Sequence, residues 1–200
     1  MSRVALIDYG AGNLHSVANA LKAAGADPLI TADPDAVRGA DRIALPGVGA
    51  FGACARGLRA IPGMVEALED AAIANARPFL GICVGMQLMA TNGEELGGDA
   101  GLGWLPGTVT AILPAPGKRV PHMGWNDVAP VVSHPLIEPG EAYFLHGFAF
   151  TGEGVIATTD HGGPITAAIG RDNLAGVQFH PEKSQRYGIA LLERFLAWRP

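Results

Sequence analysis

The chain has 200 residues, of which 48% are hydrophobic and 16% are charged, and its net charge is -5. This composition predicts one globular domain over residues 1–200 and excludes a disordered chain. The negative charge argues against nucleic-acid binding. The first carboxylate, Asp8, makes the N-terminal apolar run too short for a signal peptide, and no later run has membrane-spanning length. We therefore expect a cytoplasmic protein whose two cysteines, Cys54 and Cys83, are free thiols.

The first half of the chain alternates strand and helix signals. Gly12, the Asp33-Pro34 pair and Met64 stand near the starts of three helices. Between these helices lie four short apolar strands, at residues 4–7, 28–31, 42–45 and 78–82. Near-continuous apolar strands separated by helices indicate a mainly parallel sheet that is covered on both faces. Cys83 follows the fourth strand, just before a helix predicted at 85–89.

The second half is richer in β signals. Glycine and proline turns separate short predicted strands at residues 108–113, 142–145, 155–159, 165–169 and 174–179. An amphipathic C-terminal helix places Ile189, Leu192 and Phe195 on one side. The segments 92–103 and 114–126 are predicted to be functional loops. The expected fold is therefore α/β, a single domain with a central, mostly parallel sheet flanked by helices and a β-rich second half.

A cysteine between two glycines follows the fourth strand. Gly81, Cys83 and Gly85 have the spacing of the strand-turn-helix elbow that presents a nucleophile at the carboxyl end of a parallel strand. Such an elbow strains the backbone and brings neighbouring segments close, which requires small residues two positions before and after the nucleophile. Unpaired N–H groups at the start of the next helix would stabilise a thiolate. The elbow alone fits both a nucleophile and a buried structural thiol.

A strand near the C-terminus ends in His180, Pro181 and Glu182. Proline disfavours helical geometry at the preceding residue, so His180 is expected to be extended and to point to the same side as Glu182. Glu182 would then accept a hydrogen bond from one ring nitrogen of His180 and leave the other to take a proton from a thiol. In a chain that also carries the elbow, this pair favours a Cys-His-Glu triad of Cys83, His180 and Glu182 over a solvated pair.

A glycine-rich loop at residues 46–51 ends a different parallel strand. Its glycines leave backbone N–H groups free to face an anion. Gly49 is therefore a candidate second donor to an oxyanion hole, beside the N–H of Val84. Without the elbow, a plain turn would be the simpler interpretation of this loop.

Two other kinds of site are not favoured. Gly10, Gly12 and Asp33 imitate part of a dinucleotide-binding fingerprint. His15, however, stands at the third glycine position, where its bulk would obstruct close packing of the helix on the strand. The remaining histidines lack metal-ligand spacing with one another or with Cys54; they are His122, His134, His146 and His161. We therefore expect no metal and no cofactor.

Taken together, these motifs resemble those of the class I (triad) glutamine amidotransferases, which have a flavodoxin-like fold. GICVGMQ at 81–87 and HPE at 180–182 are shared across the class. Further motifs are similar to those of the glutaminase subunits of imidazole glycerol phosphate synthase; they are PGVGAF at 46–51, PHMGWN at 121–126, YFLH at 143–146 and HPEKSQ at 180–185. The resemblance runs from Asp8 to the C-terminal helix and implies one glutamine amidotransferase domain over residues 1–200.

The resemblance implies that the chain hydrolyses glutamine to glutamate and ammonia. Cys83 would attack the side-chain amide, His180 would carry the proton to the leaving ammonia, and Glu182 would orient His180. Gly49 and Gln87 would help to bind glutamine. The ammonia would pass to a separate cyclase subunit, a (β/α)8 barrel, which makes imidazole glycerol phosphate and an aminoimidazole carboxamide ribonucleotide in histidine biosynthesis.

In such a heterodimer, five residues would lie at or near the barrel interface; they are Asn13, Met123, Trp125, Tyr143 and Lys183. Trp125 and Tyr143 have the character of interface anchors. Ordinary core packing is the alternative for Met123 and Tyr143.

The chain departs from the family pattern at two points. Val84 stands where leucine is usual, a change that leaves the backbone donor intact. Gly147 and Phe148 follow His146, where Ser or Thr followed by Tyr is usual. These two residues are candidates for substrate binding if backbone groups rather than hydroxyls hold glutamine there.

Two other interpretations stay open. A glutaminase of the same chemistry would serve another synthase, such as pyridoxal phosphate synthase, and the identity of the barrel partner separates that case. A binding module with a vestigial triad would be catalytically silent. Labelling by a glutamine-like electrophile separates this second case, because an active enzyme requires modification at Cys83 rather than Cys54.

Overall fold

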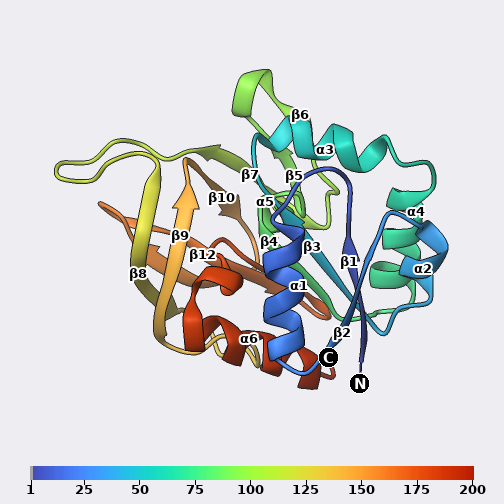
Figure 1. The fold of residues 1–200 in the computed structure, drawn as a ribbon. Helices are drawn as coiled ribbons and strands as arrows, with labels where there is room; N and C mark the ends of the chain where they lie inside the picture. The colour runs from blue at the N-terminus through green and yellow to red at the C-terminus, as the bar shows by residue number, and fades with distance from the viewer. Residues whose placement is uncertain (1) are drawn as a thin grey trace.

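A nine-stranded mixed sheet forms the centre of the computed structural model, which describes residues 2–200 (Figure 1). In sheet order its strands are β2 (Asp27–Thr31), β1 (Arg3–Ile7), β3 (Arg42–Gly47), β4 (Phe79–Cys83), β13 (Leu174–Val177), β12 (Pro164–Arg171), β11 (Val155–Asp160), β8 (His122–Pro130) and β9 (Gly140–His146). The strands from β2 to β13 are parallel, and those from β12 to β9 join antiparallel. The parallel strands follow the flavodoxin-like order, so the predicted α/β fold is confirmed.

The parallel strands and their helices form because apolar residues cluster along them. Every residue of β3 and β4 is buried, as expected for strands covered on both faces. The connecting helices are α1 (Leu14–Ala23), α2 (Pro34–Arg38), α3 (Phe51–Arg59), α4 (Met64–Leu68) and the π-helical η1 (Glu69–Ala74). As predicted, α2 begins at the Asp33-Pro34 pair, where Asp33 Oδ1 accepts the N–H of Asp35 at 2.9 Å.

The second half adds the antiparallel strands and a second, four-stranded sheet. The strands of that sheet, in order, are β10 (Phe148–Gly152), β7 (Leu105–Ala111), β5 (Ala90–Gly93) and β6 (Asp99–Ala100). The remaining elements are α5 (Val84–Gln87), η2 (Glu95–Gly97), η3 (Pro181–Lys183) and α6 (Gln185–Ala197). α6 packs against α1, and both lie in front of the sheet in Figure 1. Within residues 2–200, no helix has the length and apolar character that crossing a membrane requires.

Several boundaries differ from the prediction. β3 continues through Pro46, because β1 pairs with β3 only as far as Ala44 and the missing N–H of Pro46 therefore breaks no ladder on that side. The segment 92–103 contains η2 and β6, and the segment 114–126 ends inside β8. Helix α3 was not predicted, since Gly52 and Gly57 weaken its helix propensity. Strands β5, β6, β8 and β10 were also missed.

Candidate active site

Cys83 ends β4 in a left-handed conformation, with φ 55° and ψ -114°. This region is costly for a residue with a side chain, so the surrounding structure must impose it. A Cβ at Gly85 would collide with the carbonyl oxygen of Leu45, and a Cβ at Gly81 would lie 2.7 Å from the carbonyl oxygen of Gly85. The predicted elbow is therefore present, and the close approach of neighbouring backbone explains both of its glycines.

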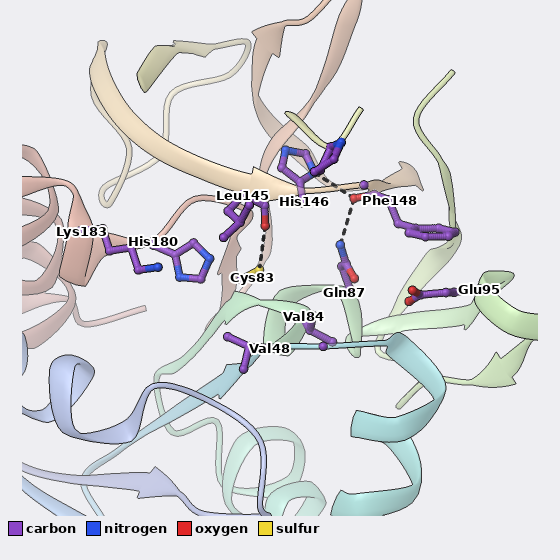
Figure 2. Close-up of a pocket in the computed structure, with 13 residues that line it drawn as sticks. Val48, Cys83, Val84, Gln87, Glu95, Leu145, His146, Phe148, His180 and Lys183 are labelled. Atoms are coloured by element: carbon purple, nitrogen blue, oxygen red, sulfur yellow. Dashed lines mark hydrogen bonds between the residues drawn. The ribbon is translucent and has the colours of Figure 1, made fainter. Parts of the chain in front are cut away.

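The elbow opens into a cavity of about 320 Å³ (Figure 2). The cavity lies between the ends of β3 and β4, the end of β9 and the turn that follows β13. Its lining residues are Val48, Gly49, Cys83, Val84, Gln87, Glu95, Pro121, Leu145, His146, Gly147, Phe148, His180 and Lys183. The structure thus brings together around one cavity the predicted nucleophile, its predicted base and every residue predicted to bind substrate or oxyanion.

His180 and Glu182 meet as predicted, but through a different backbone. His180 is extended, and its N–H donates to the carbonyl of Tyr143 at 2.9 Å. Glu182, by contrast, lies in the 3-10 turn η3 that Pro181 begins, and not on a continuing strand. The turn still places Glu182 Oε1 2.8 Å from His180 Nδ1, and both side chains are buried. The geometric part of the prediction is correct, although the strand alternation behind it is wrong.

The surroundings of His180 favour its charged form. Burial alone would lower the pKa of this imidazole, but its interactions with the side chains of Cys83 and Glu182 outweigh burial and raise the pKa to about 9. Among the residues that the structure describes, Glu182 Oε2 is buried and finds no hydrogen-bond partner, so His180 is the principal counter-group of this carboxylate. A buried imidazolium that interacts with the side chains of Cys83 and Glu182 can supply a proton to a leaving group.

The loop that carries Gly49 lies beside the elbow because β3 and β4 pair in parallel. Gly49 has φ 103°, a conformation that favours glycine, and Val48 is exposed beside it. Two buried side chains donate hydrogen bonds to backbone carbonyls of this loop. Tyr9 Oη donates to the carbonyl of Pro46 at 2.8 Å, and Cys54 Sγ donates to the carbonyl of Val48 at 3.4 Å.

The NH₂ group of Gln87 is fully used in hydrogen bonds within the protein, which the sequence did not indicate. Its Nε2 donates to the carbonyl of Phe148 at 3.0 Å and to Gln178 Oε1 at 2.9 Å, which uses both of its hydrogens. Only Oε1 is left to face the cavity. Gly147 lines the same wall and has room for a side chain, because the nearest atom to a Cβ added there would be Val120 Cγ1 at 3.9 Å.

His146 and His122 extend the hydrogen-bond network of Gln87 and Phe148 away from the cavity, toward Asn126. His146 Nδ1 donates to the carbonyl of Phe148 at 2.9 Å, and His146 Nε2 lies 3.0 Å from His122 Nδ1. On its other side, His122 Nε2 lies 3.0 Å from Asn126 Nδ2. Although the ring of His161 also packs near His122, no group of three or more metal-ligating side chains is arranged for a metal within residues 2–200.

Four of the five residues predicted for a partner interface form one surface cluster, in which Tyr143 is half-buried. Met123 and Trp125, on β8, are 66% and 48% exposed, which excludes core packing for Met123. Trp125 packs edge-on against Tyr143 of β9 with ring centroids 6.1 Å apart, and Lys183 Nζ lies 5.8 Å from the centre of the Tyr143 ring. Asn13 is exposed just before α1, which packs against η3.

Three site residues were not singled out from the sequence. Glu95 lines the cavity and accepts the N–H of Phe51 at 2.8 Å; its place in the predicted loop 92–103 was the available signal. His146 also lines the cavity, and its place in the YFLH motif at 143–146 was the available signal. Gln178 is fully buried next to Cys83, and its signal was a lone amide in the apolar run that ends β13.

Comparison with known proteins identifies the class first. Residues 5–198 match the model of the family Glutamine amidotransferase class-I. A solved structure of a glutamine amidotransferase aligns with a TM-score of 0.75 over 97% of both chains at 18% identity. The structure of PurLQS from Thermotoga maritima aligns with a TM-score of 0.74 over 98% of this chain and 99% of that chain at 20% identity. At these identities the two structures support the fold alone.

Curated relatives narrow the class. The imidazole glycerol phosphate synthase subunit HisH of Zymomonas mobilis is 60% identical over 207 residues, which cover 100% of this chain and 97% of that protein. The HisH subunit of Rhodospirillum rubrum is 54% identical over 213 residues, which cover 99% of this chain and 100% of that protein. The chain therefore belongs to the class-I glutamine amidotransferase family, in the group of its HisH relatives.

Proposed function

We propose that this chain is the glutaminase subunit of an imidazole glycerol phosphate synthase, working in the cytoplasm as one glutamine amidotransferase domain. It hydrolyses glutamine to glutamate and ammonia and delivers the ammonia to a cyclase subunit. The observation that carries the proposal is a strained cysteine that shares a cavity with a buried histidine, and this histidine is hydrogen-bonded to a buried carboxylate. The names of the HisH relatives supply the synthase, and two free thiols suit a reducing compartment.

In the first half-reaction, the Cys83 thiolate attacks the side-chain amide carbon of glutamine. A C–S bond forms, and the carbonyl electrons move to oxygen. His180, protonated between Cys83 and Glu182, gives its proton to the amide nitrogen, so that the C–N bond breaks and ammonia leaves. In the second half-reaction, neutral His180 takes a proton from water, which attacks the thioester and releases glutamate and the thiolate.

The oxyanion that forms in each half-reaction needs hydrogen-bond donors. The backbone N–H groups of Val84 and of the loop at Gly49 are the proposed donors, and both residues line the cavity. One such donor typically contributes about 3 kcal/mol of transition-state stabilisation. The bonds from Tyr9 and Cys54 hold the loop carbonyls, which limits the directions available to its N–H groups.

Glutamine itself is held by the opposite wall of the cavity. Gln87 contributes its free Oε1 as an acceptor, because both hydrogens of its amide are already used. Gly147 and Phe148 contribute backbone groups and the Phe148 ring, but the Phe148 carbonyl already accepts hydrogen bonds from Gln87 and His146.

The proposed partner is a cyclase subunit with a (β/α)8 barrel, bound as a heterodimer. It docks on the surface cluster of Met123, Trp125, Tyr143 and Lys183, with Asn13 nearby. Lys183 both lines the cavity and lies over Tyr143, so the proposed partner face adjoins the substrate cavity. The cyclase uses the ammonia to form imidazole glycerol phosphate and an aminoimidazole carboxamide ribonucleotide.

The test compares two nitrogen sources. In the complex with the cyclase, Cys83→Ala is expected to abolish synthesis from glutamine and to preserve synthesis from added ammonium. Cys54→Ala serves as the matched control and should retain synthesis from both sources. Glutaminase activity in the Cys83→Ala complex would overturn the assignment. If this chain instead binds the barrel subunit of a different synthase, its ammonia serves another pathway and the proposed partner is wrong.

A further inference from the structure

A second polar side chain faces the sulfur of Cys83. Gln178 follows the last residue of β13 and is fully buried. Because β13 pairs in parallel with β4, with Val177 opposite Ile82, the residue that follows β13 lies beside the elbow. The Nε2 of Gln178 is 3.7 Å from Cys83 Sγ.

The direction of the Gln178 amide is set by its neighbours. The carbonyl of Phe148 can only accept hydrogen bonds, so the group of Gln87 that faces it must be the NH₂. The second hydrogen of that NH₂ then points at the oxygen of Gln178, 2.9 Å away. With its oxygen turned toward Gln87, Gln178 presents its own NH₂ to the sulfur of Cys83.

A third donor strengthens this assignment. His146 Nδ1 also donates to the Phe148 carbonyl, which therefore accepts from two sides and is fixed in position. In the series of hydrogen bonds from Phe148 through Gln87 and Gln178 to Cys83, each contact joins a donor to an acceptor. Reversing the Gln178 amide would set its NH₂ against the NH₂ of Gln87 and leave two buried donors facing each other, which is costly.

We propose that Gln178 donates a hydrogen bond to the Cys83 thiolate and is a further catalytic residue of the glutaminase reaction, an inference that rests on the function proposed above. Cys83 is only 4% exposed, so water would contribute little to the stabilisation of a thiolate there and protein donors must replace it. The same hydrogen bond serves both half-reactions. It favours the thiolate over the thiol before attack, and it stabilises the sulfur as the leaving group when the thioester is hydrolysed.

The experiment measures alkylation of Cys83 by iodoacetamide against pH in the full-length chain, with mass spectrometry to separate Cys83 from Cys54. Gln178→Met and Gln178→Leu remove the donor at similar volume. In either folded variant, the pH of half-maximal alkylation rate is expected to rise by about one unit, as loss of a hydrogen bond to a charged group predicts.

A matched control separates this effect from a general loss of packing. Asn173 is another buried amide, but it donates only to the carbonyls of Ala72 and Arg77. Asn173→Leu should lower stability and leave the alkylation profile of Cys83 unchanged. An unchanged profile in a folded Gln178 variant would overturn the proposal.

A measurement on the unsubstituted chain covers the case in which both Gln178 variants fail to fold. In ¹H–¹⁵N spectra, the side-chain amide signals of Gln178 should shift as Cys83 ionises, while those of Asn173 stay fixed. Invariant Gln178 signals would overturn the proposal. If a chloroketone analogue of glutamine does not modify Cys83 in the native chain, the glutaminase function itself fails. If it does, an unchanged alkylation profile rejects only the role of Gln178.

Discussion

His122 and His146 face each other across β8 and β9, with Nδ1 of His122 3.0 Å from Nε2 of His146. His146 must donate its Nδ1 hydrogen to the Phe148 carbonyl, so its Nε2 accepts from His122. His122 Nε2 then accepts from Asn126. The network is satisfied only when both rings are neutral. Burial and the neighbouring histidines accordingly lower the pKa of His122 to about 3 and that of His146, despite its bond to Phe148, to about 4.

Acid should therefore destabilise the fold through these two histidines. Their pKa values are lower in the folded chain than the ordinary 6.5, so the unfolded chain binds more protons between about pH 3 and 6.5. Their stabilisation is present above pH 6.5 and is lost as the pH falls. Each histidine contributes at most about 1.4 kcal/mol per pH unit to the slope of the unfolding free energy. His146→Gln should reduce this slope in urea titrations. The exposed His15→Gln is the control, and equal slopes in both variants would contradict the prediction.

Removal of His180 should cost stability as well as activity. Within residues 2–200, Glu182 Oε2 has no hydrogen-bond partner and Oε1 is bonded only to His180. His180→Ala therefore leaves a buried carboxylate uncompensated, and we expect the free energy of unfolding to fall by about 3 kcal/mol or more. Urea denaturation should show recovery of part of this loss in the His180→Ala/Glu182→Ala double variant. If the single and double variants unfold alike, Glu182 does not depend on His180 for compensation.

The carboxylate of Glu182 should set the alkaline limit of glutamine hydrolysis. Glu182→Gln removes a charge that raises the pKa of His180, so the imidazolium is lost at lower pH than about 9. In the complex with the cyclase, we expect the alkaline limb of kcat to move to lower pH and kcat to fall about a hundredfold. A lower kcat with an unmoved alkaline limb would mean that Glu182 only orients the ring.

The glycines of the site should differ sharply in their tolerance of alanine. Gly85→Ala would drive a Cβ into the Leu45 carbonyl, and we expect a loss of about 3 kcal/mol. Gly147→Ala would place its Cβ in ordinary contact with Val120 Cγ1, 3.9 Å away, and should change stability by less than about 0.5 kcal/mol. Thermal unfolding of the two variants checks both values. Gly147→Ser, which the cavity wall also accommodates, should lower KM if a hydroxyl can bind glutamine there.

Trp125 should anchor the cyclase. It is 48% exposed and braced edge-on by Tyr143. Trp125→Ala is expected to weaken binding of the cyclase by about thirtyfold or more in calorimetry, in the range of interface hot spots. Leu29, 55% exposed on β2 at the opposite edge of the sheet, provides the control, and Leu29→Ala should leave affinity unchanged. Similar losses in both variants would reject the proposed face.

The elbow could be predicted because its signal is local. Gly81, Cys83 and Gly85 lie within five positions of the chain. The two glycines are needed because neighbouring backbone comes too close to leave room for a Cβ, as the structure shows. The meeting of His180 with Glu182 was also predictable, since Pro181 restricts the backbone between them. The 3-10 turn that joins them was not, because a strand and a tight turn after proline can both bring these two side chains together.

The buried hydrogen-bond network could not be predicted from the sequence, because it depends on the register between strands. His122 and His146 are directly paired across β8 and β9, but alternation along one strand does not state which residue of another strand lies opposite. The same holds for Gln178, which reaches Cys83 only through the pairing of β13 with β4. Likewise, the two hydrogen bonds that occupy the Gln87 amide involve partners more than sixty residues away.

Strand β9 contributes, within seven residues, both to the proposed partner face and to the surroundings of Cys83. Tyr143 packs against Trp125 on the proposed partner face, while two positions later the carbonyl of Leu145 lies 4.0 Å from Cys83 Sγ. A change in this strand that suits a new partner would also move the surroundings of the nucleophile. The proposed partner face and the surroundings of Cys83 therefore share one backbone segment.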